Sequence, residues 1–235
     1  MRELLHTGLA QLGIVPPEGA AELLVRYAAL LLRQNEVMNL TAITAPEDVA
    51  TLHFLDSAAL LAAADFRGKR VIDVGTGAGF PGLPLKILEP SVELTLLDSL
   101  DKRIVWLRSV CAELGLFGVE CLHARAEEQG LAAGYRDSFD LALSRAVAPL
   151  RLLGELCLPF VRPGGRFLAM KTTGCGEELS QAAHGLQLLG GTVLPPYDYV
   201  IPHTGVTHRA VMVEKISHTP KGYPRRWAKI QKAPL

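Results

Sequence analysis

Residues Val71–Lys86, VIDVGTGAGFPGLPLK, place a loop with four glycines between a short apolar run and a segment with helical spacing. Gly77, Gly79 and Gly82 have the G-x-G-x-x-G spacing with which a strand-turn-helix unit holds a dinucleotide. Asp98 ends the next apolar run, near the place of the ribose-binding acid of such units. The stretch therefore predicts a ligand-binding loop at the end of a strand, although the glycine spacing alone does not identify the ligand.

The other residues of this loop favour a cationic ligand over a pyrophosphate. A pyrophosphate is bound by backbone N–H groups at the positive end of a helix, whereas Pro81 has no N–H and Asp73 adds a negative charge close by. S-adenosylmethionine fits better, because its sulfonium and ammonium groups are offset by only one carboxylate. We expect the backbone of Gly75, Gly77 and Gly79 to contact this cofactor while Asp73 faces its amino group.

From Lys69 onward, short β-rich runs alternate with segments of helical spacing. The expected strands are 70–74, 92–98, 119–124, 139–146, 166–171, 192–200 and 208–216, and the expected helices are 83–88, 102–114, 150–159 and 177–189. This alternation predicts an α/β fold, a Rossmann-like, doubly wound sheet of seven strands, mostly parallel, with helices on both faces. Because no helix separates the last two strands, they should pair as a hairpin that adds an antiparallel edge strand.

In such a sheet the ligand lies beyond the carboxyl ends of the strands, so the residues that end each strand should converge. These are Asp73–Gly79, Asp98, Ala124–Glu127, Ser144–Ala146 and Lys171. Asp98 can accept both ribose hydroxyls, since a carboxylate takes two donors at once. We expect Ala126 and Glu127 to border the adenine.

Three segments are expected along the chain. Helical spacing of apolar residues around Leu24–Leu31 and Val49–Ala59 predicts an N-terminal helical region over 1–66. The cofactor-binding domain follows at 67–217, and 218–235 form a basic C-terminal tail. The tail follows the last strand, so we expect it to reach the crevice only from outside.

Composition is typical of a globular protein: 235 residues, 49% of them hydrophobic, with zero formal net charge. No apolar run approaches the ~20 residues of a membrane span, and the N-terminus has no signal pattern, so we expect a cytoplasmic protein. The four cysteines have wide, irregular spacings, which favours reduced thiols over a zinc site or a disulfide framework. We expect no metal site.

The neutral total hides a basic C-terminus, because residues 215–235 carry six Lys and Arg and no acid. Cations for phosphates and flat rings for unstacked bases are what a single-stranded or looped RNA needs. The residues expected to bind RNA are Lys221, Arg225, Arg226, Trp227, Lys229 and Lys232. The alternative is a solvated terminal charge run.

Seven motifs in a fixed order carry a family resemblance. They are NLTAIT at 39–44, HFLDS at 53–57, DVGTGAGFPGLPLK at 73–86, LLDSLDKR at 96–103, RAEE at 125–128, SRAVAP at 144–149 and TPKGYPRR at 219–226. In them the chain resembles the class I methyltransferases that make 7-methylguanosine in bacterial small-subunit (16S) rRNA, the glucose-inhibited division protein B family. The resemblance covers nearly the whole chain. The family usually has glycine directly after the lysine that ends the fifth strand, whereas this chain has Lys171-Thr172-Thr173-Gly174.

The resemblance implies a class I Rossmann-like fold, S-adenosylmethionine as cofactor, and 16S rRNA or a small-subunit particle as substrate, with the chain acting as a monomer and no membrane partner. It also implies which residues form the cofactor site: Gly75, Phe80, Asp98, Ser99, Leu100, Ala126, Glu127 and Arg145.

The expected chemistry needs little from the protein beyond positioning. Nitrogen 7 of guanine has an in-plane lone pair and no proton to lose, so methyl transfer requires no general base and no covalent intermediate. Arg145 and Lys171 are the expected catalytic residues, because their N–H groups can hold O6 in the keto form as the ring gains positive charge. The alternative for each is an ion pair with a structural role. His53 and Asp56 share a helical face and should dock the helical region against the core.

Two other functions remain possible from the sequence. A nicotinamide-dependent oxidoreductase would use the same glycine spacing, but it predicts a pyrophosphate loop without Pro81 and Asp73. An RNA-binding module that keeps S-adenosylmethionine only as a structural ligand would share every motif.

Overall fold

The computed structural model describes residues 1–145 and 148–235. Its helices are α1 (Arg2–Gln11), α2 (Ala20–Met38), α3 (Pro46–Asp48), the π-helical η1 (Val49–Leu55), α4 (Asp56–Ala58), α5 (Leu60–Ala63), α6 (Gly82–Leu88), α7 (Asp101–Leu114), α8 (Ala126–Gln129), α9 (Leu150–Cys157), the 3-10 helix η2 (Leu158–Phe160), α10 (Gly176–Leu188) and α11 (Trp227–Lys232). Its strands are β1 (Arg70–Val74), β2 (Glu93–Asp98), β3 (Val119–His123), β4 (Phe139–Arg145), β5 (Val161–Thr172), β6 (Gly191–Val193), β7 (Tyr197–Val200) and β8 (Thr207–Lys215).

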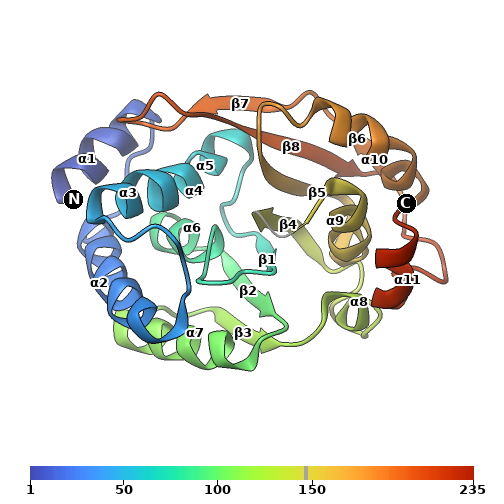
Figure 1. Cartoon of the computed structure of the whole chain (residues 1–235), viewed down its shortest axis with the longest axis horizontal. Helices are drawn as coiled ribbons and strands as arrows, with labels where there is room; N and C mark the ends of the chain where they lie inside the picture. The colour runs from blue at the N-terminus through green and yellow to red at the C-terminus, as the bar shows by residue number, and fades with distance from the viewer. Residues whose placement is uncertain (146–147) are drawn as a thin grey trace.

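The described strands form one sheet in the order β3-β2-β1-β4-β5-β8-β6, with β7 also paired to β8. Strands β3, β2, β1, β4 and β5 are parallel, and β8 is antiparallel to β5, β6 and β7. The strand order reverses between β1 and β4, which is where doubly wound sheets open a crevice beyond their carboxyl ends. Figure 1 shows β1 and β4 in the middle of the molecule.

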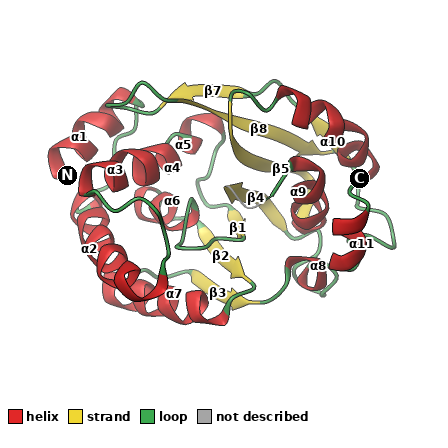
Figure 2. Cartoon of the chain, in the orientation of Figure 1, coloured by secondary structure: helices red, strands yellow, loops and turns green. Residues whose placement is uncertain are grey.

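Helices cover both faces of the sheet, and two hydrophobic clusters fill the spaces between. One cluster joins Leu141, Leu143 and Leu168 to the N-terminal helices, α6 and α7, and the other joins Ala142 and Phe167 to α9, α10 and α11. Neighbouring residues of β4 and β5 thus go to opposite cores, which explains why these strands read as continuous apolar runs. Figure 2 shows the yellow strands between the two groups of red helices.

The predicted α/β class and mostly parallel sheet are confirmed, but the edge differs in two details. The expected strand 192–200 is divided into β6 and β7, because Pro195 and Pro196 lie between them and have no N–H for the sheet. Both short strands pair with the same side of β8, so the described sheet has eight strands. The antiparallel strand β8 lies one position inside the edge, and the predicted hairpin forms between β7 and β8.

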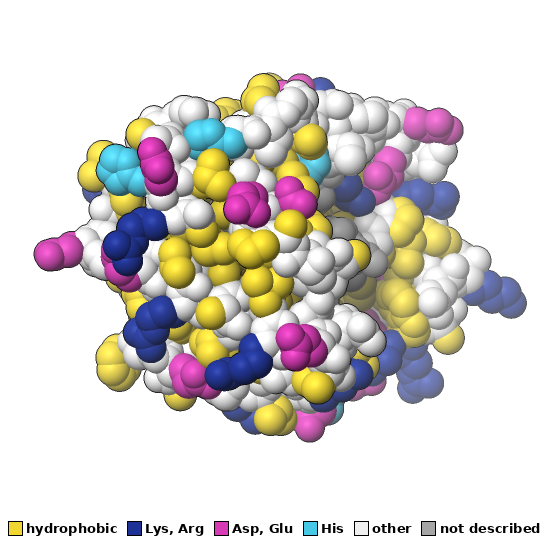
Figure 3. Space-filling view, turned by 60° about the vertical axis from the view of Figure 1, so that its left-hand side comes forward, with side chains coloured by type: hydrophobic (Ala, Val, Ile, Leu, Met, Phe, Trp, Pro, Cys, Tyr) yellow, Lys and Arg dark blue, Asp and Glu magenta, His cyan; other side chains and the backbone are white. Residues whose placement is uncertain are grey.

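The N-terminal helices share their core with the sheet. Leu5 in α1, Leu24 in α2 and Phe54 in η1 are buried in the cluster that also contains Leu94 of β2. Figure 3 brings this side of the molecule forward and shows hydrophobic side chains in the middle of the face, with acidic and basic groups interspersed around them. No helix within residues 1–145 and 148–235 combines the length and apolarity of a membrane span.

Candidate active site

The glycines of the loop after β1 have two different roles. Gly77 has φ +60°, and a Cβ added there would meet nothing closer than the Gly75 carbonyl oxygen at 4.0 Å, so its outer side is open. Gly79 has φ +93°, and a Cβ there would lie 2.5 Å from the Tyr27 hydroxyl and 2.8 Å from Leu83. Gly77 therefore presents bare backbone to a ligand, whereas Gly79 lets the loop pack on α2.

Asp73 lies beneath this loop. Its Oδ2 accepts hydrogen bonds from Thr76 Oγ1 at 2.7 Å and from the Gly82 N–H at 2.9 Å, and the side chain is fully buried. Burial raises the pKa of this carboxyl to about 6. Asp73 Oδ2 therefore supports the loop from within, and Asp73 is not among the residues that line the adjoining cavities, so its predicted contact with the cofactor amino group stays a prediction.

Asp98, the last residue of β2, binds the loop after β1 on the side where both line a cavity. One oxygen accepts from the Gly77 N–H at 2.9 Å and from Arg103 Nη1 at 3.3 Å, and the other accepts from the Leu100 N–H at 2.9 Å. Three of the roughly four acceptor positions of a carboxylate are thus engaged. The remaining position, together with the long Arg103 contact, leaves Asp98 able to accept from a ribose.

Three cavities follow one another across the carboxyl ends of the strands. The first, of about 250 Å³, and the second, of about 380 Å³, share Gly75, Asp98 and Ser99. The third, of about 600 Å³, shares His53 and Arg145 with the second. Asp98 and Arg145 therefore mark the two boundaries of a continuous row of cavities.

The first cavity is an apolar slot with a carboxylate at its wall. Val74, Leu97, Leu156 and the Trp227 indole line it together with Ala126 and Glu127. Glu127 is almost fully buried and accepts a 2.6 Å hydrogen bond from Arg125 Nε. These features suit a flat heteroaromatic ring that carries an amino group.

Arg145 connects the second and third cavities. Its Nη1 donates to the Leu52 carbonyl at 3.1 Å and to Asp56 Oδ2 at 3.3 Å, and its guanidinium stacks over the Phe80 ring at 4.8 Å. His53 accepts from Nη2 at 3.0 Å. Only 15% of the Arg145 side chain is exposed, so its charge acts on whatever enters either cavity.

The β7–β8 hairpin contributes to the third cavity, which the sequence did not reveal. Asp56, almost fully buried, accepts from the Tyr199 hydroxyl at 2.8 Å and from His208 Nδ1 at 2.9 Å. The hydrogen bond with Asp56 raises the pKa of His208. The contacts join residues 143 and 152 positions apart, so the helical spacing of His53 and Asp56 indicated a docking role but not these partners.

Lys171 ends β5 at the rim of the third cavity. Its Nζ donates to Glu178 Oε1 at 2.7 Å and to the Ala148 carbonyl at 2.9 Å, and 13% of the side chain is exposed. Thr172, at the departure from the family pattern, lines the same cavity. The lysine is therefore both an ion-pair partner of α10 and a possible donor to a ligand there.

The structure brings most of the predicted cofactor residues together. Those that line the first two cavities are Gly75, Gly77, Phe80, Asp98, Ser99, Ala126, Glu127 and Arg145. Leu100 does not line them, because its N–H is used by Asp98 and its side chain is 42% exposed. Gly79 does not line them either. The predicted strand end at Ala146 lies outside the described residues.

The tail differs most from its prediction. Arg225 donates to Glu155, with Nη2 to Oε2 at 2.6 Å, and its side chain is only 12% exposed, so it is not available to RNA phosphates. Trp227 lines the first cavity, so the tail does not merely reach the crevice from outside. The exposed cations are Lys221, Arg226, Lys229 and Lys232.

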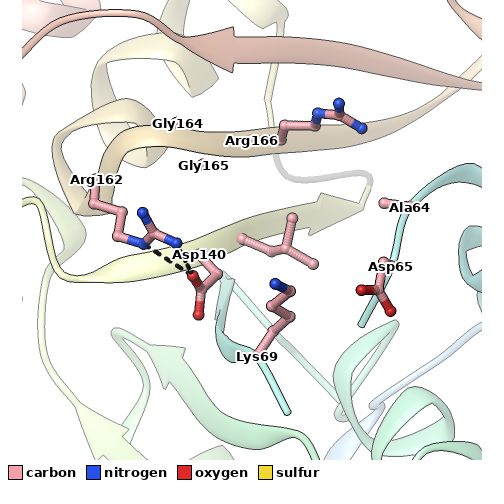
Figure 4. Close-up of a pocket in the computed structure, with 9 residues that line it drawn as sticks. Ala64, Asp65, Lys69, Asp140, Arg162, Gly164, Gly165 and Arg166 are labelled. Atoms are coloured by element: carbon pink, nitrogen blue, oxygen red, sulfur yellow. Dashed lines mark hydrogen bonds and ion pairs between the residues drawn. The ribbon is translucent and has the colours of Figure 1, made fainter. Parts of the chain in front are cut away.

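Two other features carry no site. No group of three or more His, Cys, Asp or Glu within the described ranges is arranged to hold a metal ion. A cavity of about 210 Å³ lies at the amino ends of the strands, away from the loop, and its Arg162 is tied to Asp140 Oδ1 at 2.6 Å (Figure 4). Its position opposite the crevice separates it from the row of cavities.

The residues present fit S-adenosylmethionine. The open side of Gly77 is a cradle that a side chain would fill, and Asp98 stands between a slot for a base and a cavity that ends at two arginines, Arg103 and Arg145. A purine, a ribose diol and a carboxylate-bearing chain would find complementary groups in this order.

Comparisons with known proteins agree with this arrangement. The family model GidB, described as rRNA small subunit methyltransferase G, matches residues 20–196. The chain is 44% identical over 236 residues to ribosomal RNA small subunit methyltransferase G of Alkaliphilus oremlandii (strain OhILAs), covering 100% of this chain and 99% of the relative. It is 42% identical over 234 residues to the protein of the same name from Thermoanaerobacter pseudethanolicus (strain ATCC 33223 / 39E), covering 99% and 98%.

Solved structures show the same fold. TrmN from Thermus thermophilus is 26% identical with a TM-score of 0.52, and the match covers 68% of this chain and 48% of that one. A SAM dependent methyltransferase from Aquifex aeolicus is 19% identical with a TM-score of 0.55, and the match covers 76% and 97%. By its sequence, its fold and the residues around the loop after β1, the chain belongs to the rRNA small subunit methyltransferase G (GidB) family.

Proposed function

We propose that this chain transfers a methyl group from S-adenosylmethionine to nitrogen 7 of a guanine in small-subunit (16S) ribosomal RNA. The observation that carries the proposal is the row of three cavities, in which Arg145 lies between the cofactor cavities and a larger one of about 600 Å³. A base held in the third cavity would face the cofactor across this arginine.

S-adenosylmethionine, the cofactor of this family, supplies an activated methyl group on a sulfonium. The chain's part is to bind and orient. Asp98 orients the ribose, the Gly77 backbone admits the ligand closely, and Arg103 and Arg145 offer cations to a carboxylate. Holding two reactants in line removes much of the entropic barrier of a bimolecular step.

The third cavity supports nitrogen 7 as the acceptor, because its polar groups are donors or are already engaged. Arg145, Lys171 and His208 present N–H groups to it. Asp56 is satisfied by Tyr199, His208 and Arg145. Among the described lining residues, both ring nitrogens of His53 are engaged, and the hydrogen bond with Asp56 raises the pKa of His208 and so favours its proton-donating imidazolium. This lining suits nitrogen 7, whose methylation requires no removal of a proton.

Arg145 and Lys171 hold the catalytic role in this proposal. A guanine offers O6 as an acceptor beside nitrogen 7, and a fixed guanidinium or ammonium donor keeps this edge in the keto form while the ring gains positive charge. Because the Leu52 carbonyl and the Glu178 carboxylate already hold the two cations in place, little reorganisation is needed.

The RNA around the target base would meet the exposed tail cations Arg226, Lys229 and Lys232. Each phosphate contact would release counterions and make binding salt-dependent.

The test is incubation with methyl-labelled S-adenosylmethionine and either deproteinised 16S rRNA or assembled small subunits. Label is expected in RNA from at least one source. The matched control is the same RNA transcribed with 7-deazaguanosine, which has a carbon in place of nitrogen 7 and should accept no label. Label in the 7-deaza transcript would refute the acceptor, and unlabelled RNA in every preparation would refute the enzyme.

A further inference from the structure

The C-terminal helix α11 reaches the first cavity of the row. The Trp227 indole lines it opposite Gly75, Asp98 and Ser99, and the Arg125 guanidinium stacks on the indole at 5.9 Å from the ring centroid. Arg125 in turn binds Glu127 at 2.6 Å. The wall of this cavity thus combines Gly75, in the loop after β1, with Trp227, in the C-terminal tail.

Trp227 is held in place by anchors on both sides of it in sequence. Before it, Arg225 is bound by Glu155, which is fully buried in α9, and Arg136 donates to the Tyr223 carbonyl at 2.8 Å. After it, Arg151 donates to the carbonyls of Pro234 and Leu235, both at 2.7 Å. The cations of the globular domain bind tail carbonyls, so the tail is docked as part of the fold.

The docked segment has two sides. Ile230, one turn after Trp227, is fully buried in the core cluster against which the indole packs. Arg226, Lys229 and Lys232, also three residues apart, are exposed. Residues three apart lie on one face of a helix, so the same short helix offers a ring to the cavity and charges to solvent.

We infer that the tail completes the cofactor site, with the Trp227 indole forming the wall against which the adenine of S-adenosylmethionine stacks. This inference rests on the proposed function, since it assigns one subsite of that cofactor. The apolar part of the slot also includes Val74, Leu97 and Leu156, which give an adenine no aromatic partner; among the described lining residues Trp227 alone supplies one. In this arrangement the tail contacts the cofactor through Trp227 and the RNA through the exposed Arg226, Lys229 and Lys232.

The experiment is calorimetric titration of the full-length protein with S-adenosylmethionine. Trp227→Ala should weaken binding by about tenfold to hundredfold, the range for loss of a base-stacking ring. Trp227→Phe keeps a flat ring and should bind within a few-fold of the wild type. Gln231→Ala, an exposed change in the same helix, is the matched control and should leave the affinity unchanged.

A second measurement uses the tryptophan fluorescence of the wild type, with the conservative Trp227→Phe variant as its control. The chain has two tryptophans, and Trp106 is buried in the core on the other face of the sheet. Wild-type emission should be quenched by S-adenosylmethionine and by adenosine but not by methionine, and the quenching should disappear in Trp227→Phe. Unchanged emission together with wild-type affinity in Trp227→Ala would overturn the inference. A wild-type protein that does not bind S-adenosylmethionine would overturn the proposed function as well.

Discussion

His53 Nδ1 lies 3.0 Å from Arg145 Nη2 and joins the N-terminal helical segment η1 to the end of β4. Burial and the Arg145 charge lower the pKa of His53 to about 3, so the imidazole is neutral and accepts this hydrogen bond. Its other nitrogen then donates to Thr41 Oγ1 at 2.8 Å, and its ring stacks on Phe80 at 4.3 Å. The N-terminal helices thereby position the arginine that lies between the second and third cavities.

Arg145→Ala should lower single-turnover methylation by at least about hundredfold, the scale of lost positioning. The fold should lose only about 1–3 kcal/mol, because Asp56 keeps Tyr199 and His208 as partners. Arg145→Lys keeps the charge but cannot reach Leu52, His53 and Asp56 together, so its rate should stay close to that of Arg145→Ala. Rapid-quench assays at saturating ligands, with melting curves alongside, measure both effects, and a normal rate for Arg145→Ala would remove the catalytic role.

Asp98→Ala should weaken S-adenosylmethionine binding by roughly 1–3 kcal/mol, since a charged acceptor is lost for the ribose and for the Gly77 N–H. Asp101→Ala is the control, because this acid is exposed and bonds to His123 instead. Calorimetry should separate the two variants; equal affinities would place Asp98 outside the site.

Gly77→Val and Gly79→Ala should fail in different ways. Valine at 77 fills the open side of the loop and should abolish cofactor binding, with a stability loss of about 1–2 kcal/mol from the left-handed backbone. Alanine at 79 would clash with Tyr27 and Leu83, so it should unfold at lower denaturant than Gly77→Val. Retained binding in a folded Gly77→Val would contradict the loop assignment.

His208→Asn should cost more stability at low pH than at high pH. Asp56 raises the folded-state pKa of His208 above its ordinary 6.5, against the opposing effects of burial and Arg145. The ion pair therefore stabilises the fold fully below pH 6.5, and this contribution is lost as the pH rises through the folded-state pKa. Asp73 and His53 titrate in the wild type and in His208→Asn alike, so their contributions cancel in the difference in stability between the two. Melting temperatures from pH 6 to 9 measure the difference, and a constant difference would show that His208 is not charged in the fold.

Removing single exposed tail cations should change RNA binding without changing the fold. Lys229→Ala and Lys232→Ala should each reduce the salt slope by about 0.7 if the side chain meets a single-stranded phosphate. Arg225→Ala should behave differently and destabilise the protein by about 3 kcal/mol, because it leaves the buried Glu155 carboxylate without its cation and with only the backbone N–H of residue 225 as a donor. Filter binding of RNA across a salt series measures the slope for each variant. Parallel plots of log affinity against log salt concentration for the wild type and the lysine variants would favour a solvated charge run.

Local pattern in the sequence determined the strands β1 to β5, the longer helices between them and the loop at Gly75–Phe80, but not the division of 192–200 into two strands. The alternation of β-rich and helical runs, the glycine spacing and the acid at Asp98 are all short-range signals, and strand carboxyl ends converge whatever the details of packing. The loop residues already favoured S-adenosylmethionine, and the strand ends pointed to Ala126 and Glu127; the family motifs added Phe80 and Ser99, which also line the cavities.

Tertiary structure decided which polar groups remain available, because a residue's partner depends on chain segments far away. Arg225 is bound to Glu155, 70 positions earlier in the chain. Asp56 of α4 meets Tyr199 and His208 only because folding brings the β7–β8 hairpin against the N-terminal helices. The same reason explains Trp227: its charged neighbours in the sequence suggest RNA, whereas docking of the tail on α9 turns the indole toward the cofactor cavity.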